Sequence, residues 1–408
     1  MRVAGGGDDY LLILSESAGT IGSATVTVNG GTNSLPLLDA RRSAGVRRHI
    51  PTASWGLGLG PSRAVERAET DPAVGSTRTF NVVEGSTPTV TATLRTKGTH
   101  CLLYVDNSTV VGAFTDDDLV DLREEFDSQI YATDTSLFGA TGDVDGNGRI
   151  ILLFTPTIRD GGYGYFCPAD VAGAGNQADM LYCRVPSPNN GQTYTVLRTG
   201  LLATMAHELQ HLISWHHKSS LGGEESWLNE GMSFACEQLN GWLDSAGGSP
   251  ENVAAFFQSP ERYTLHELTG SYDDGHAGAD YLLVRYLIDR FGQSVLGELT
   301  TSGEVGQANI TASTGVAFTS LMTDAAAAWF LAGTGLTSDA RWSLPGFDTH
   351  GTYPVESVSL SGPRVTRVSG ANSQPAFQAS FARGGLRYLR ITNRSEERRV
   401  GKECRSRW

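Results

Sequence analysis

Two histidines four residues apart lie inside a segment with the hydrophobic spacing of an α-helix. They are His207 and His211, and residues four apart lie about 40° apart around a helix, so both imidazoles project from one face. Apolar residues recur around them at Val196, Leu197, Leu201, Leu202, Met205, Leu209, Leu212 and Ile213. Burying two imidazoles in such a helix is costly unless they bind a partner. The pattern therefore predicts a buried helix, over residues 193–217, that presents both histidines to a shared ligand.

The residues between the two histidines favour zinc as that ligand. His207-Glu208-Leu209-Gln210-His211 is an HExxH motif, in which the two histidines bind Zn²⁺. Glu208 follows the first ligand directly, so its carboxylate can reach a water molecule at the metal and act as a general base. The motif predicts a zinc site with hydrolytic chemistry.

A third zinc ligand is expected from a second helix, because a catalytic zinc usually has three protein ligands. Glu230 lies beyond His211 with eighteen residues between them. Glu224 and Glu225 compete for the role. Glu237 follows on the same helical face as Glu230, where it would either orient a ligand histidine or face solvent.

The spacing of HExxH, eighteen residues and Glu resembles the gluzincin metallopeptidases. Over residues 104–331 the chain also resembles the hyicolysin-type neutral zinc metallopeptidases. Besides the HExxH motif, the matching segments are 104–106, 126–127, 142–148, 164–166, 227–231 and 286–292. The resemblance implies a zincin fold, like that of thermolysin, and a secreted bacterial peptidase that is often flanked by β modules.

A peptidase of this type also needs a hydrogen-bond donor for the oxyanion. In gluzincins a histidine or tyrosine from a later segment supplies it, which makes His276, Tyr281 and Tyr286 candidates. Core packing explains the two tyrosines better, because they lie at helical spacing among leucines. We take His276, at a Gly-rich helix start, as the candidate donor beside the general base Glu208.

The order of the predicted elements indicates an α+β fold, because strand-like runs come first and helical segments follow. We expect a β-rich module over residues 1–99 and a metallopeptidase domain with the motif helix over residues 100–337. A second, truncated β-rich module would cover residues 338–393. Both β segments would be sandwich-like and would flank the catalytic domain.

Residues 394–408 resemble the translation of a common sequencing adapter. They carry nine charges in fifteen residues, which breaks the local composition. We expect the natural protein to continue beyond Asn393, and we exclude the segment from fold reasoning.

The four cysteines outside that segment suit two disulfides in a secreted protein. Cys167 and Cys183 flank a Gly-rich loop and would pair locally, which leaves Cys101 for Cys236. Two buried free thiols are the alternative. The chain has no CxxC spacing, so a cysteine zinc site is not expected.

An acidic loop resembles the first half of a calcium loop, with Asp143, Asp145 and Asn147 as oxygen ligands. An EF-hand would place a glutamate where this chain has Phe154, so the loop is not an EF-hand. The three residues would bind Ca²⁺ only with an outside partner. The alternative is a tight turn that leads into the next strand.

The overall composition excludes several classes of partner. With a net charge of −13, we do not expect the basic surface that binding to nucleic acid requires. No apolar run reaches the roughly 18 residues of a membrane helix, and no signal peptide is visible at Met1. We expect an extracellular monomer that acts on protein or peptide substrates. The alternative is a non-catalytic adhesin or binding protein on a zincin scaffold, which would have no chemical need for Glu208.

Overall fold

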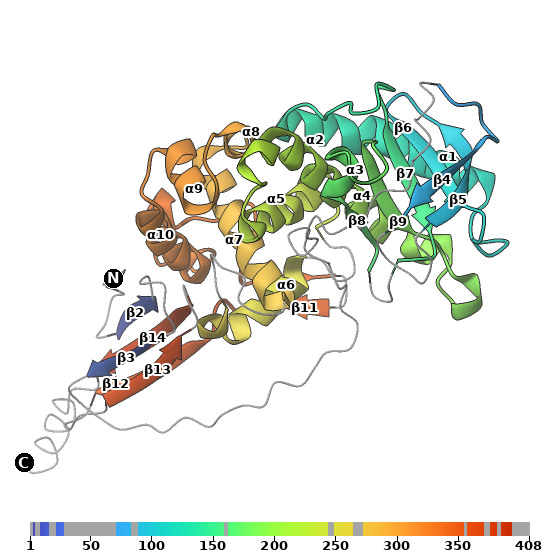
Figure 1. Cartoon of the computed structure of the whole chain (residues 1–408). Coiled ribbons are helices and arrows are strands. Elements are labelled where there is room, and N and C mark those ends of the chain that lie inside the picture. Colours follow the sequence, from blue (N-terminus) through green and yellow to red (C-terminus); the bar gives the residue numbers. More distant parts are fainter. Residues whose placement is uncertain are drawn as a thin grey trace, which may run out of the picture.

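Strands and helices are mixed in this protein, in agreement with the predicted α+β class. The computed structural model describes residues 3–4, 9–15, 22–27, 71–82, 89–158, 162–243, 249–263, 272–354, 357–370, 376–381 and 385–393. Residues 394–408, which resemble an adapter, lie outside them. Figure 1 shows a sheet with its covering helices, a helical part in yellow and orange, and a small group of strands from both ends of the chain.

A six-stranded sheet has the order β4-β5-β6-β7-β9-β8. Its strands are β4 (Thr77–Asn81), β5 (Thr89–Lys97), β6 (Cys101–Asp106), β7 (Ile150–Thr155), β8 (Gly164–Phe166) and β9 (Met180–Arg184). The central strands β6, β7 and β9 are parallel, and the other pairs are antiparallel. Every residue of β6 and β7 is buried, as expected for apolar strands that are covered on both faces.

The described part of the chain also contains ten α-helices. They are α1 (Asp116–Glu125), α2 (Tyr131–Phe138), α3 (Pro168–Val171), α4 (Tyr194–Lys218), α5 (Ser226–Leu239), α6 (Ser249–Gln258), α7 (Asp274–Phe291), α8 (Ser294–Thr301), α9 (Gly306–Thr314) and α10 (Phe318–Leu331). The helix predicted over residues 193–217 is confirmed as α4. A π-helical turn, Phe126–Ile130, joins α1 to α2.

The two faces of the six-stranded sheet are buried in different ways. Cys101, Leu103 and Val105 point to the face that α1, α2 and α4 cover. Leu102 and Tyr104 point to the opposite face, where they belong to a second apolar cluster with side chains of β4, β5 and the segment around α3. The alternation along β6 thus gives the sheet one face toward the motif helix and one away from it.

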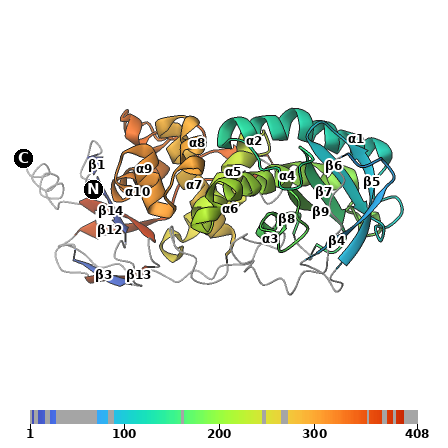
Figure 2. The ribbon, with the colours of Figure 1, turned by 45° about the horizontal axis from the view of Figure 1, so that its top comes forward.

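Strands from both ends of the chain pair with one another. β2 (Asp9–Ser15) is antiparallel to β14 (Leu386–Asn393), and β3 (Gly22–Thr27) is antiparallel to β13 (Ala376–Phe381). Short β1 (Val3–Ala4) extends this group beside β2, and β12 (Val365–Gly370) runs parallel to β14. β10 (Thr352–Tyr353) and β11 (Val358–Ser359) form a separate pair. Figure 2 shows β12 and β14 of this group beside α10.

This pairing crosses the division into modules that the sequence suggested. β4 and β5, from the predicted N-terminal module, hydrogen-bond within the sheet of the predicted catalytic domain. β2 and β3 instead pair with strands near the other end of the chain. Tyr388 on β14 donates a hydrogen bond to the Ala326 carbonyl oxygen of α10 at 2.9 Å, which ties this group to the helical part.

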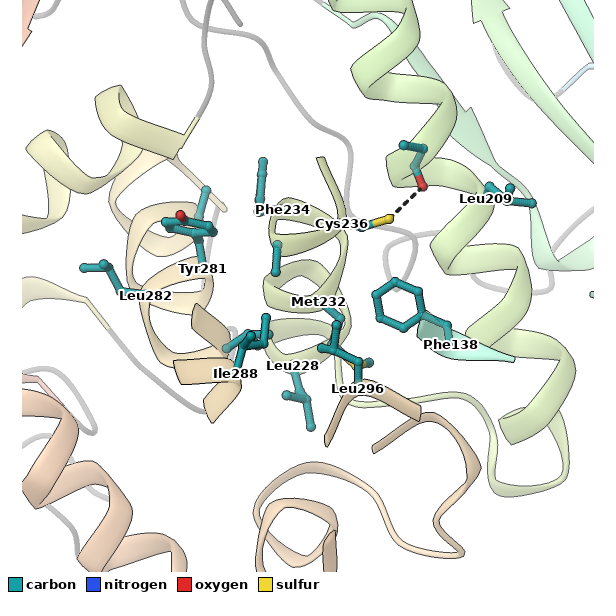
Figure 3. Packing of buried hydrophobic residues seen from close by; sticks show 14 of the residues in the cluster. Phe138, Leu209, Leu228, Met232, Phe234, Cys236, Tyr281, Leu282, Ile288 and Leu296 are labelled. Carbon is teal, nitrogen blue, oxygen red and sulfur yellow. Dashed lines mark hydrogen bonds between the residues drawn. The ribbon is translucent and has the colours of Figure 1, made fainter. Parts of the chain in front are cut away.

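The helical core lies between α4, α5 and α7. Figure 3 shows Phe138 of α2, Met232 of α5 and Leu296 of α8 close together in the apolar core. Two glycines allow α7 to approach its neighbours closely. A Cβ atom on Gly231 of α5 would lie 2.5 Å from the Asp280 carbonyl oxygen of α7. A Cβ atom on Gly278 would likewise meet the backbone of α6.

We expect Gly231→Ala to destabilise the protein by about 1–3 kcal/mol, because α5 and α7 must move apart to admit the methyl group. Gly303→Ala is the matched control, since a Cβ atom there would meet nothing within 4 Å. Denaturant unfolding of both variants measures the difference. Equal unfolding free energies would show that the helix crossing does not depend on glycine.

The four cysteines that the structure describes are free thiols, so both predicted disulfides are wrong. Cys167 and Cys183 belong to apolar clusters on opposite faces of the sheet, which prevents their pairing. Cys101 on β6 and Cys236 on α5 each donate a hydrogen bond to a different aspartate. Burial raises the pKa of all four thiols, which keeps them protonated.

Asp134 on α2 is fully buried and accepts hydrogen bonds at Oδ1 from Cys236 Sγ at 3.0 Å and Asn240 Nδ2 at 2.7 Å. Burial raises the pKa of its carboxyl group to about 7. The folded protein therefore favours the protonated acid. That stabilisation is complete below the unfolded-state pKa near 4 and is lost as the pH rises through 7.

We expect Asp134→Asn, which cannot ionise, to gain stability over the wild type as the pH rises. The gain should be roughly 2–3 kcal/mol larger at pH 8 than at pH 5. Urea unfolding of both proteins at the two pH values checks this. A gain that is the same at both values would mean that Asp134 does not titrate in this range.

Candidate metal centre

Two helices bring the three predicted zinc ligands together. α4 carries His207 and His211, and α5 carries Glu230. One ligand atom from each side chain lies within 4.8 Å of the other two. His207 Nε2 is 3.3 Å from Glu230 Oε2, and His211 Nε2 is 3.6 Å from Glu230 Oε1. All three residues are at most 2% exposed, so the group is a compact donor set inside the protein.

The chemistry of this donor set fits a metal cation. Burial lowers the pKa of His207, but hydrogen bonds from the ring to Glu230 and Glu237 outweigh burial and raise that pKa to about 10. The neighbouring carboxylates therefore stabilise a positive charge at this position. A proton on His207 is one source of that charge. Two imidazole nitrogens and a carboxylate oxygen form a common ligand set for Zn²⁺. A metal cation at this position would supply the same positive charge.

Glu237 contacts the first histidine. Its side chain is 5% exposed, and Oε1 lies 2.9 Å from His207 Nδ1. This contact leaves Nε2, the nitrogen near Glu230, for a metal. Of the two roles considered for Glu237, the structure agrees with orientation of a ligand histidine and not with a solvent-facing position.

Glu208, the predicted general base, is 1% exposed and lies between the motif helix and the sheet. Its Oε2 accepts a hydrogen bond from the Phe166 backbone N–H at 2.9 Å. Phe166 ends β8, the strand at one edge of the sheet and in contact with α4. The sequence did not indicate this contact, because the two residues are 42 apart in the chain and meet only where α4 packs against β8.

The two competing acids have other partners. Glu224 forms a buried ion pair with Lys218, in which Nζ and Oε2 are 3.0 Å apart. Glu224 also accepts hydrogen bonds from the Gly306 N–H and from Asn309 Nδ2, each at 2.6 Å. Glu225 Oε2 accepts from Trp227 Nε1 at 2.6 Å. The structure groups neither acid with the two histidines.

His276 lies in the first turn of α7, outside the three-residue group. Its Nδ1 is 2.9 Å from Oδ1 of Asp273, the residue that caps this helix. The Tyr272 ring stacks on it with a centroid distance of 5.8 Å. Tyr281 and Tyr286 are buried in the helical core, as core packing predicted. A catalytic role of His276 remains a prediction.

Two further residues beside Glu230 were not expected from the sequence. The Tyr272 hydroxyl donates to Asp280 Oδ2 at 3.1 Å. Burial and, to a smaller degree, the Glu230 carboxylate raise the pKa of Asp280 well above its usual range. Through Tyr272, His276 is thus connected to the surroundings of Glu230. Asp280 is a single aspartate among the apolar residues of a helix, and such a residue does not reveal in the sequence that it lies beside Glu230.

The acidic loop belongs to a second cluster of acidic residues. Its members differ from the calcium ligands that the sequence predicted. Asp143 and Asp145 lie together with Asp179, with ligand atoms within 4.8 Å of one another. Asn147 Oδ1 accepts instead from the Arg149 backbone N–H at 2.6 Å, as in a tight turn. Burial raises the pKa of Asp145 to about 6. Calcium binding at this loop remains a prediction.

The geometry defines a class of candidate site, in which two histidines and one carboxylate could hold a single metal ion and a glutamate lies adjacent. No protein-family model matches the chain. The chain is similar to the neutral metalloprotease ShpI of Staphylococcus hyicus, with 25% identity over 193 residues. The aligned part covers 44% of this chain and 43% of that protein, so the chain spans less than half the length of this relative. The similarity supports a metallopeptidase and no finer assignment.

None of the helices in the described stretches combines the length and the apolar character that spanning a membrane requires.

Proposed function

We propose that this protein is a zinc-dependent peptidase that hydrolyses peptide bonds of protein or peptide substrates. The observation that supports the proposal most is the buried group of His207, His211 and Glu230 with Glu208 beside it. The similarity to a neutral metalloprotease supports the same class of reaction. Secretion rests on the family resemblance alone, because the free thiols remove the support that disulfides would have given.

Each residue of the site would have a separate role in the reaction. A zinc ion held by His207, His211 and Glu230 would act as a Lewis acid on the scissile carbonyl and lower the pKa of a water ligand. Glu208, fixed by the Phe166 N–H, would take a proton from the attacking water and pass it to the leaving amine. His276 would donate a hydrogen bond to the developing oxyanion. The products are one carboxylic acid and one amine, and Glu208 ends in its original state.

A casein zymogram with and without a metal chelator tests the proposal. We expect clearing by the wild-type protein, no clearing with 1,10-phenanthroline, and recovery when zinc is added back. A protein that is folded, binds zinc and leaves casein, gelatin and short peptides intact would contradict the proposal and favour the non-catalytic binding protein.

A further inference from the structure

Tyr272 contacts two residues of α7 with the two ends of its side chain. Its ring stacks on His276 with an interplanar angle of 25° and a centroid distance of 5.8 Å. Its hydroxyl donates a hydrogen bond to Oδ2 of Asp280 at 3.1 Å. His276 and Asp280 are four residues apart, and residues at this spacing are neighbours on one face of a helix. Tyr272 therefore spans one turn of α7 along that face.

This face of α7 is turned toward the helix that carries Glu230. A Cβ atom on Gly231, the residue after Glu230, would lie 2.5 Å from the Asp280 carbonyl oxygen, so α5 and α7 approach closely at this point. Burial raises the pKa of the Asp280 carboxyl group most, and the Glu230 carboxylate adds to that rise, so the two groups lie near one another. Since His276 shares the face of Asp280, it too is directed toward α5.

The hydrogen bond from Tyr272 satisfies a buried group. Asp280 is 2% exposed, and its Oδ1 has no hydrogen-bond partner among the residues that the structure describes. Leaving both oxygens of a buried carboxyl group unpaired is costly. The bond to Oδ2 is therefore favoured, and it anchors the Tyr272 side chain beside α7.

Two further residues hold the His276 ring. Its Nδ1 lies 2.9 Å from Oδ1 of Asp273, which caps the helix. Tyr263 packs against the ring edge to face, with centroids 5.2 Å apart. Tyr263 can come this close because a Cβ atom on Gly275 would lie only 2.0 Å from its ring. The imidazole is thus confined on several sides, and Tyr272 is the contact that connects it to Asp280.

We propose that Tyr272 is a positioning residue for His276: the hydrogen bond from its hydroxyl to Asp280 holds the stacked ring, and with it the imidazole, on the face of α7 that is turned toward Glu230. This inference rests on the proposed function, because it gives His276 its place in that reaction. It assigns no contact with substrate to Tyr272 or Asp280.

Steady-state kinetics of Tyr272→Phe tests the hydroxyl, because phenylalanine keeps the stacked ring. We expect kcat to fall about 10–100-fold, with KM and zinc content unchanged, since misplacing a group near the reacting atoms costs factors of this size. Adding Tyr272→Phe to His276→Ala should cause no further loss, because both changes act through one imidazole.

Tyr388→Phe is the matched control for the kinetics. Tyr388 is also buried, and its hydroxyl donates a hydrogen bond to the Ala326 carbonyl oxygen at 2.9 Å, between β14 and α10. The variant loses a comparable hydroxyl in another part of the protein. Its kcat and KM should equal those of the wild type.

Variants of Asp280 test the same hydrogen bond from its other end. Asp280→Asn keeps an oxygen that can accept from Tyr272, so it should retain most of the activity. Asp280→Ala removes the acceptor and should lower kcat as Tyr272→Phe does. This second variant also serves if Tyr272→Phe fails to fold.

Modification of His276 by diethylpyrocarbonate gives a readout that needs neither metal nor activity. The His276 side chain is 14% exposed, so access of the reagent to the ring is restricted. We expect the modification, mapped by mass spectrometry, to be several-fold faster in Tyr272→Phe than in the wild type. It should be unchanged in Tyr388→Phe.

The outcomes separate this inference from the proposed function. Wild-type protein without peptidase activity would overturn both. An active wild type, together with full kcat or unchanged His276 modification in Tyr272→Phe, would overturn the role of Tyr272 and leave the proposed function standing. An equal loss from Tyr272→Phe with and without the His276 side chain would show that the hydroxyl does not act through His276, and would also overturn the inference.

Discussion

Glu208→Gln should retain its zinc and lose peptidase activity by about two to four orders of magnitude. The substitution removes the group that accepts the proton, and general acid–base catalysis contributes factors of this size. The amide oxygen of glutamine can still accept the hydrogen bond from the Phe166 N–H, so the local structure should persist. Zinc content by elemental analysis and kcat/KM on a peptide substrate measure the two effects separately.

Glu298→Gln is the control for the Glu208 experiment, because Glu298 is exposed on α8. It should match the wild type in both measurements. Loss of zinc from Glu208→Gln would make Glu208 a ligand or a structural residue. Retained zinc with unchanged kcat/KM would rule out Glu208 as the general base.

Lys218→Met should lower the free energy of unfolding by about 3–5 kcal/mol, because it breaks a fully buried ion pair. The side chains of Lys218 and Glu224 are both 0% exposed. Lys218 Nζ also donates to the carbonyl oxygens of Ser302 and Glu304, so the ammonium group has three partners. Methionine would leave the Glu224 carboxylate buried without its cation.

Two variants make the Lys218 prediction specific. Lys97→Met removes a partly exposed ion pair with Asp71, and should cost far less stability than Lys218→Met because solvent screens the pair. Adding Glu224→Gln to Lys218→Met removes the uncompensated charge and should recover part of the loss. Urea unfolding gives all the values. Similar losses for Lys97→Met and Lys218→Met would contradict a special role of the buried pair.

The local pattern of the motif helix contained enough information to predict α4. A run of apolar residues at helical spacing and two histidines four apart require one buried helix with both rings on one face, and the structure has it. The convergence of Glu230 on the histidines was likewise predicted, and it is observed. The pattern sufficed because Glu230 lies on the next helix and a short connection leaves few ways to pack it.

Features that depend on contacts between distant segments could not be predicted in this way. Cys167 and Cys183 look like a local pair in the sequence, but sheet pairing sends their side chains to opposite faces. Asp179 joins Asp143 only because the strand that follows it pairs with β7. The partner of a strand is set by tertiary packing, and short alternating runs do not specify it.

The buried position of Lys218 is a related case. At the end of an amphipathic helix a lysine normally interacts with the helix dipole and remains in water. Here the connection between α8 and α9 folds over it and supplies carbonyl oxygens. Nothing in the sequence near Lys218 indicates that segment, which lies more than eighty residues further along the chain.

The zinc content of the purified protein tests the central claim most directly. Elemental analysis should find about one zinc per chain in the wild type, and close to none in His211→Ala, because one of three ligands is then missing. Both proteins should be dialysed against the same metal-free buffer and checked for folding by circular dichroism. No zinc in the folded wild type, or undiminished zinc in folded His211→Ala, would contradict a metal centre formed by His207, His211 and Glu230.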